Sequence, residues 1–170
     1  ERPRRLERKK EMLFWTPEEF ASAISEVKGD VYRVFFTFLY FTGCREGEAF
    51  ALSWQDIDLV KKRVNINKSL TRKAHDGDKS YKIGPPKNDA SYRRIPMPDS
   101  LCRILAEYKE QCDDGRFVFG GEKPLSLSTC ERRLTAAAGL AQVKRIRIHD
   151  LRHSCATLLV HKKVSIVTIS

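Results

Sequence analysis

The most informative part of the chain is VYRVFFTFLYFT, residues 31–42, which is apolar on nearly every side. A helix with this pattern is expected at the centre of a core rather than on its surface. Gly43 follows directly and predicts the end of that helix, because glycine readily adopts the backbone conformation of a helix C-terminus. The continuous apolar run is well short of the roughly 18 residues that a membrane-crossing helix needs. The sequence therefore predicts no membrane contact.

Further helices are predicted on both sides of this central segment. Residues 16–19, TPEE, combine a capping threonine, a proline suited to the first helical position and a glutamate that completes a capping box. Phe20, Ile24 and Val27 mark the buried face of the helix that follows. The other predicted helices are Arg45–Ser53, Leu101–Cys112 capped by Asp99 or Ser100, Ser128 to about Ala138 ended by Gly139, and one from near His149.

Between residues 58 and 98 the apolar pattern changes to a period of two, in short segments separated by turn residues. This pattern predicts a small antiparallel sheet. The turn-rich segment GPPKND, residues 84–89, places Lys87 on or beside a hairpin turn, from which it can reach a ligand. The fold class predicted is α+β and mainly α-helical.

The charge balance favours a polyanionic partner. Across 170 residues, 32 Lys and Arg against 22 Asp and Glu leave a net charge of +10, and such an excess favours nucleic acid through counterion release. A basic but merely solvated surface is the alternative. The five cysteines include no C-x-x-C pair, which argues against a disulfide framework or zinc knuckle and fits a cytoplasmic location.

Three separated segments place cations or imidazoles where packing does not explain them. They are TGCREGE at 42–48 with Leu52 and Trp54 behind it, Lys87 ahead of RRIPMP at 93–98, and HDLRH at 149–153. In this order and spacing they resemble the tyrosine recombinase (phage integrase) family, whose catalytic domains share T-G-x-R-x-x-E, a hairpin lysine and H-x-L-R-H. The resemblance extends from about Met12 onward.

The resemblance implies a helical catalytic domain with a small three-stranded antiparallel sheet over residues 12–170, cut short at its C-terminus. Residues 1–11, strongly basic and poor in apolar side chains, are similar to the linker from an N-terminal core-binding domain. The implied activity is integration, excision or inversion of double-stranded DNA through a 3′-phosphotyrosine intermediate. Four protomers of the same recombinase would act on two DNA sites, with no ATP and no metal.

Four residues are the candidate catalytic set. Arg45 and Arg152 suit a phosphate clamp, because guanidinium groups stay protonated and bind oxyanions bidentately. Lys87 is the candidate general acid for the leaving 5′-oxygen, and His149 is placed to bind the phosphate or handle a proton. We expect the side chains of residues 45, 87, 149 and 152 to converge on a pocket that fits one phosphodiester.

Other residues are predicted to support this set or to contact DNA. Glu48 and His153 are the supporting candidates, the first one turn along from Arg45 and the second at the edge of the core. An ion pair with Glu48 is the alternative role for Arg45, and Lys87 is alternatively one solvated turn lysine among several. The candidates for contacts with DNA, none of them expected to be catalytic, are Arg93, Arg94, Lys144, Arg145 and Arg147. Arg93 and Arg94 are alternatively charges on the surface of a strand.

No nucleophile is assigned. The family's nucleophile is a tyrosine beyond the H-x-L-R-H motif, whereas all five tyrosines precede His149, namely Tyr32, Tyr40, Tyr81, Tyr92 and Tyr108. We therefore expect this chain by itself to bind DNA weakly and to form no covalent intermediate.

Three other interpretations are open at this stage. A non-catalytic DNA-binding or regulatory module would keep the fold and the basic face but never cut, and a type IB topoisomerase would share the chemistry. His149 and His153, with His161, also have the i, i+4 spacing of a metalloprotease, but Asp150 stands where that motif needs glutamate.

Overall fold

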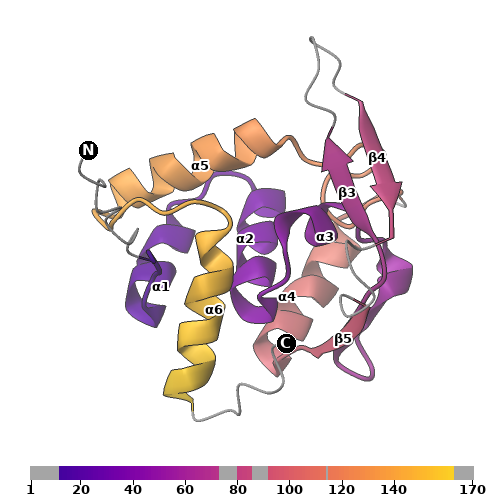
Figure 1. Ribbon diagram of the computed structural model, residues 1–170, viewed down its shortest axis with the longest axis horizontal. Helices are drawn as coiled ribbons and strands as arrows, with labels where there is room; N and C mark the ends of the chain where they lie inside the picture. The colour runs from indigo at the N-terminus through magenta and orange to yellow at the C-terminus, as the bar shows by residue number, and fades with distance from the viewer. Residues whose placement is uncertain (1–11, 73–79, 86–91, 114, 163–170) are drawn as a thin grey trace, which may run out of the picture.

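The computed structural model describes residues 12–72, 80–85, 92–113 and 115–162, and of His161 only the backbone. This part of the chain forms a mainly helical α+β domain, as predicted (Figure 1). In chain order the elements are α1 (Pro17–Ser25), α2 (Asp30–Thr42), α3 (Glu46–Phe50), the short 3-10 helix η1 (Trp54–Asp56), β1 (Ile57–Asp58), β2 (Arg63–Ile66), β3 (Ser69–Arg72), β4 (Tyr81–Gly84), β5 (Arg93–Pro96), α4 (Asp99–Glu110), α5 (Leu127–Leu140) and α6 (Asp150–His161).

Helix α2 is the centre of the core, with α6 on one side and α4 on the other (Figure 1). Its residues from Val34 to Tyr40 are all buried. The Phe35 ring stacks on Phe50 of α3 with centroids 5.0 Å apart and meets the edge of Phe119 at 5.3 Å. Burial on every face explains why the sequence of this helix has no polar stripe.

Helix α1 begins with the predicted capping box. The Thr16 hydroxyl accepts from the Glu19 backbone N–H (3.2 Å), and the Glu19 carboxylate accepts from the Thr16 N–H (2.9 Å). Just before it, Trp15 is buried and joins two distant segments. Its backbone N–H donates to the Ser154 hydroxyl in α6 (2.9 Å), and its indole N–H donates to the Lys144 carbonyl (2.8 Å).

The strands form two antiparallel sheets rather than one. The predicted three-stranded sheet is present with the order β1-β2-β5. Strands β3 and β4 form a separate two-stranded antiparallel sheet (Figure 1). In the larger sheet Ile66 of β2 lies opposite Arg93 of β5, and Val64 lies opposite Ile95. Lys87 falls in residues 86–91, outside the described part of the chain, so its predicted place on a hairpin turn stays a prediction.

Two helices differ from the prediction at their ends. Neither Asp99 nor Ser100 caps α4, because the helix begins at Asp99 after Pro98, and the Asp99 carboxylate instead pairs with Lys62 at 2.8 Å. Helix α5 begins at Leu127 and continues through Gly139 to Leu140. The residue that takes the left-handed conformation after this helix is Gln142 (φ 55°), not Gly139.

The Arg45–Ser53 helix was also predicted too long. Only Glu46–Phe50 is α-helical, with Arg45 at its N-cap in an extended conformation, and η1 follows. Among the described residues, no helix is long and apolar enough to cross a membrane.

Candidate functional site

A buried carboxylate, Glu48, lies at the centre of the candidate site. Its side chain is 2% exposed and accepts four hydrogen bonds from two arginines. Arg45 donates its backbone N–H to Oε2 (2.8 Å) and its side-chain Nη1 to Oε1 (3.2 Å). Arg93 donates Nη1 to Oε1 (3.0 Å) and Nη2 to Oε2 (2.8 Å), which is a bidentate pair.

The charge of Glu48 is held by these contacts. Burial raises the pKa of its carboxyl, but the hydrogen bonds from Arg93 and Arg45 outweigh burial, so that the net pKa lies below the usual value. Glu48 is therefore ionised at neutral pH. Its burial depends on its two arginine partners, because an unpaired buried carboxylate is strongly disfavoured.

Arg45 and Glu48 are brought together by the capping box at the start of α3, where they are the N-cap and N3 residues. The helix that carries them packs closely on β3. At Gly47, between these two residues, a Cβ atom would lie 2.8 Å from the Leu70 carbonyl oxygen and 2.8 Å from the Ser69 hydroxyl. Only glycine allows this approach. The second glycine of the T-G-C-R-E-G-E segment thus sets how near the motif lies to the sheet.

Arg152, in the first turn of α6, lies near the same cluster of Arg45, Glu48 and Arg93. Its guanidinium donates to the carbonyl of Gly43, the residue that ends α2. Burial lowers the pKa of Arg152, and repulsion from Arg45 and Arg93 lowers it further. Three guanidinium groups from separate segments therefore share one region around one buried carboxylate.

His149 is the exposed N-cap residue of α6 and lies next to this region. Its Nδ1 is 3.6 Å from a carboxylate oxygen of Glu46, the residue that follows Arg45. Its ring meets that of His153 at 5.3 Å in an edge-to-face arrangement. Among the described residues, no group of three or more His, Cys, Asp or Glu side chains is arranged to hold a metal ion.

The structure thus brings Arg45, His149 and Arg152 into one neighbourhood, together with Glu48 and Arg93. Lys87 belongs to the residues that the structure leaves undescribed. The chemical roles of these side chains remain predictions.

The five basic residues expected to contact DNA are in two different situations. Arg94 and Arg145 are exposed. The other three are held by carboxylates: Arg93 by Glu48, Lys144 by Glu19 (2.9 Å) and Arg147 by Asp150 (2.8 Å). Arg93 in particular is not a solvated strand-surface charge, because its side chain is only 17% exposed.

Asp150 is a buried acid that sequence reasoning did not assign to any role. It is 1% exposed, and its carboxylate accepts from the backbone N–H of Arg147 (2.8 Å) and from two nitrogens of the Arg147 guanidinium (3.0 and 2.8 Å). Burial raises the pKa of Asp150, but these hydrogen bonds hold the net pKa below its usual range. The contacts fasten the turn that precedes α6 and so help to position His149 and Arg152.

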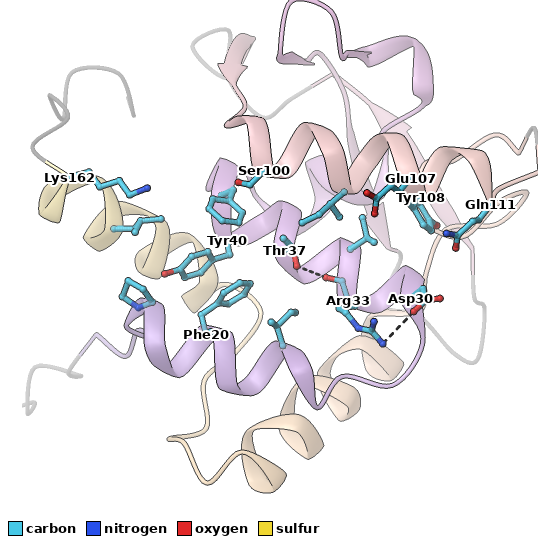
Figure 2. A pocket seen from close by; sticks show the side chains of 17 residues that line it. Phe20, Asp30, Arg33, Thr37, Tyr40, Ser100, Glu107, Tyr108, Gln111 and Lys162 are labelled. Atoms are coloured by element: carbon cyan, nitrogen blue, oxygen red, sulfur yellow. Dashed lines mark hydrogen bonds and ion pairs between the residues drawn. The ribbon is translucent and has the colours of Figure 1, made fainter.

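An apolar pocket of the described part of the chain lies away from this site. Figure 2 shows an apolar groove of about 810 Å³ between α1, α2, α4 and α6, with the Asp30–Arg33 ion pair (3.4 Å) at one end. Phe20 and Tyr40 stack in it at 3.8 Å, and burial raises the pKa of Tyr40 to about 12. None of the predicted site residues lines this groove.

Comparison with known sequences gives a family match over most of the chain. The profile of the phage integrase family matches residues 16–170. The ICEBs1 integrase of Bacillus subtilis (strain 168) is 30% identical over 175 residues, covering 95% of this chain and 46% of that protein. A XerC-like tyrosine recombinase of Caldanaerobacter subterraneus subsp. tengcongensis is 28% identical, covering 94% and 46%. The chain spans about half the length of these curated relatives.

Solved structures show the same fold at low sequence identity. The Tn1549 transposon integrase in complex with circular intermediate DNA superposes with a TM-score of 0.76 at 20% identity, covering 92% of this chain and 56% of that one. XerA recombinase gives 0.70 at 23% identity (92% and 54%), and a lambda integrase dimer bound to a COC′ core site gives 0.64 at 19% (97% and 59%). The fold prediction is therefore confirmed.

Proposed function

Because the chain belongs to the phage integrase family, we propose that it is the catalytic part of a site-specific DNA recombinase, which cleaves and rejoins DNA through a 3′-phosphotyrosine intermediate. The observation that carries this proposal is the convergence of Arg45 and Arg152 beside the buried Glu48. These two arginines come from separate motifs, and their guanidinium groups lie near enough for each to feel the charge of the other.

The arrangement suits the binding of a phosphodiester. Burial lowers the pKa of Arg152 most, and repulsion from the like charges of Arg45 and Arg93 lowers it further. An anion placed among them relieves that repulsion, and the relief grows as negative charge builds up on the non-bridging oxygens. The Arg45 side chain is 50% exposed, so it is open to such a ligand. Arg45 and Arg152 therefore act as the clamp for the scissile phosphate.

His149 and Lys87 supply the proton chemistry in this proposal. His149 lies at the N-terminus of α6, where the positive end of the helix dipole favours an anion. There it binds the phosphate or takes the proton of the nucleophile. Lys87 protonates the leaving 5′-oxygen, an assignment that stands on the sequence alone. The reaction conserves the phosphodiester bond energy and so needs no ATP.

Double-stranded DNA and further copies of the same protein are the proposed partners. Two of the solved structures with this fold are DNA complexes, one of them a dimer. Arg94 and Arg145, both exposed, are the first candidates for phosphate contacts outside the site. We further propose residues 12–170 as the catalytic domain, residues 1–11 as a linker and the cytoplasm as the site of action; all five cysteines are free, consistent with a reducing compartment.

A suicide-substrate assay tests the proposal. The full-length protein is incubated with nicked DNA that traps the cleaved state, and covalent protein–DNA adducts are measured at saturating DNA. We expect an adduct for the wild type, and for Arg152→Ala a rate lower by about 10²- to 10³-fold with little change in DNA affinity, the usual effect of removing one donor to a transition-state oxyanion. Arg103→Ala, an exposed arginine on α4, is the control and should behave as wild type.

Two outcomes decide the proposal. Wild-type protein that binds DNA tightly but forms no adduct would refute strand cleavage and favour a non-catalytic DNA-binding module with the same fold. The 170-residue chain, assayed in parallel, is expected to give no adduct, because none of its tyrosines follows His149. An adduct on that chain would overturn the expectation that none of its five tyrosines is the nucleophile.

A further inference from the structure

Arg93 differs from the other basic residues predicted to contact DNA because it points into the candidate site. It is the first residue of β5, and its guanidinium covers both oxygens of Glu48 (3.0 and 2.8 Å). Its side chain is 17% exposed, whereas the side chain of Arg45 is 50% exposed. Of the two arginines on Glu48, Arg93 is therefore the enclosed partner and Arg45 is the one that solvent or a ligand can reach.

The geometry of the two ion pairs is also unequal. Arg93 makes a bidentate pair, the strongest arrangement for a guanidinium and a carboxylate. The Arg45 side chain makes one hydrogen bond of 3.2 Å, to Oε1 alone. Arg45 holds Glu48 more firmly through its backbone N–H (2.8 Å) than through its charge. The negative charge of Glu48 is thus matched mainly by Arg93.

We propose that Arg93 is a positioning residue, which neutralises Glu48 and so leaves the Arg45 guanidinium available to the scissile phosphate. The inference rests on the proposed function and deepens it. Counting only the arginines and the buried carboxylate that the structure describes here, Arg45, Arg93 and Arg152 set against Glu48 leave an excess of two positive charges. Without Arg93 the excess falls to one, and Arg45 becomes the main countercharge of a buried carboxylate.

Two simpler roles for Arg93 make different predictions. If Arg93 itself bound the phosphate, removing it would weaken the site whatever residue stands at position 48. If Arg93 only stabilised the fold, its loss would lower stability, but the molecules that remain folded would cleave at the normal rate. A charge-balanced double variant separates the three roles.

The experiment compares Arg93→Met with Arg93→Met/Glu48→Gln in the full-length protein. Methionine keeps most of the length of arginine without its charge. Glutamine keeps an oxygen that can accept from the Arg45 N–H, and the double variant again leaves two positive charges, those of Arg45 and Arg152. Single-turnover cleavage at saturating DNA, DNA affinity and thermal unfolding are measured for each protein, well below its unfolding temperature.

We expect Arg93→Met to cleave about 10²-fold more slowly, within the range found for losing one transition-state donor, with DNA affinity changed less than threefold. The double variant Arg93→Met/Glu48→Gln should cleave at least tenfold faster than Arg93→Met. Arg93→Lys should also cleave faster than Arg93→Met, because lysine keeps the positive charge. Arg103→Met, on the exposed surface of α4, controls for losing one positive charge elsewhere and should cleave like wild type.

The outcomes also separate this inference from the proposed function. If the wild-type protein forms no adduct, the proposed function itself is refuted. A wild type that cleaves, with a double variant as slow as Arg93→Met, overturns the positioning role and favours direct phosphate contact. Folded Arg93→Met that cleaves at the wild-type rate overturns it in favour of a structural role.

Discussion

Gly43 offers the sharpest test of how the backbone holds the site. It ends α2 with φ +62°, in the left-handed region, and its carbonyl accepts a hydrogen bond from Arg152. An alanine in this conformation is disfavoured by about 1 kcal/mol relative to glycine. Gly43→Ala therefore loses stability from backbone strain alone, before any side-chain contact is considered.

The new methyl group also destabilises the folded state by crowding Cys155. A Cβ at Gly43 would lie 3.0 Å from Cys155 Sγ and 3.3 Å from Cys155 Cβ, so α6 or the Cys155 side chain must move by a few tenths of an ångström. Overpacking of this kind in a core destabilises by about 1–3 kcal/mol. The two terms together predict that Gly43→Ala lowers the free energy of unfolding by about 2–4 kcal/mol.

Urea denaturation followed by circular dichroism measures this change, with the m-value checked for constancy. Gly139→Ala is the matched control, because Gly139 lies within α5 and a Cβ there has nothing within 4 Å. That variant should gain about 0.5–1 kcal/mol, the usual preference for alanine over glycine inside a helix. If Gly43→Ala unfolds within 0.5 kcal/mol of wild type, the strain argument and the close contact with Cys155 are both wrong.

Three further predictions concern stability. The pKa of Asp150 is lowered in the folded state, so its stabilising effect is present in full above its unfolded pKa of about 3.9 and is lost as pH falls through the folded pKa. Asp150→Asn should therefore destabilise at pH 7 and destabilise less at pH 3, as measured by urea unfolding at both values. Thr16→Ala removes the cap that accepts from Glu19 and should lower the free energy of unfolding by about 1 kcal/mol, with Thr16→Ser close to wild type as the comparison. Leu134→Ala opens a cavity at a side chain that is 1% exposed and should lower that free energy by about 2–5 kcal/mol in the same measurement; a loss below 1 kcal/mol would contradict close packing there.

Local sequence signals predicted the parts of the fold whose causes are local. The capping box at Thr16 and the all-round apolar pattern of α2 each depend on residues within one or two turns of helix. The end of α5 could not be predicted in this way. Gly139 looked like a stop signal, but the left-handed residue is Gln142, whose backbone N–H donates to the Gly139 carbonyl while the Val143 N–H donates to Ala138.

For Arg93, the direction of the side chain could be predicted from the sequence, but its ion-pair partner could not. In a strand, alternate residues face the same side, so Arg93 shares a side with Ile95, which packs against the core. That alternation was a signal that Arg93 points inward while Arg94 points outward. What the sequence could not supply was the partner, because Glu48 is 45 residues away and reaches Arg93 only through the packing of α3 on the sheet.

The buried Glu48 carboxylate stabilises the cluster of guanidinium groups in the unliganded protein. Burial lowers the pKa of Arg152 most and repulsion from Arg45 and Arg93 lowers it further, so without a countercharge the three guanidinium groups would destabilise one another more strongly. Glu48 removes part of the repulsion but not all of it, and a phosphodiester then removes more. A second buried acid would stabilise the empty site further and would leave less attraction for the phosphate. Within the part of the site that the structure describes, one buried carboxylate among three arginines therefore stabilises the empty site and still leaves it favouring an anion.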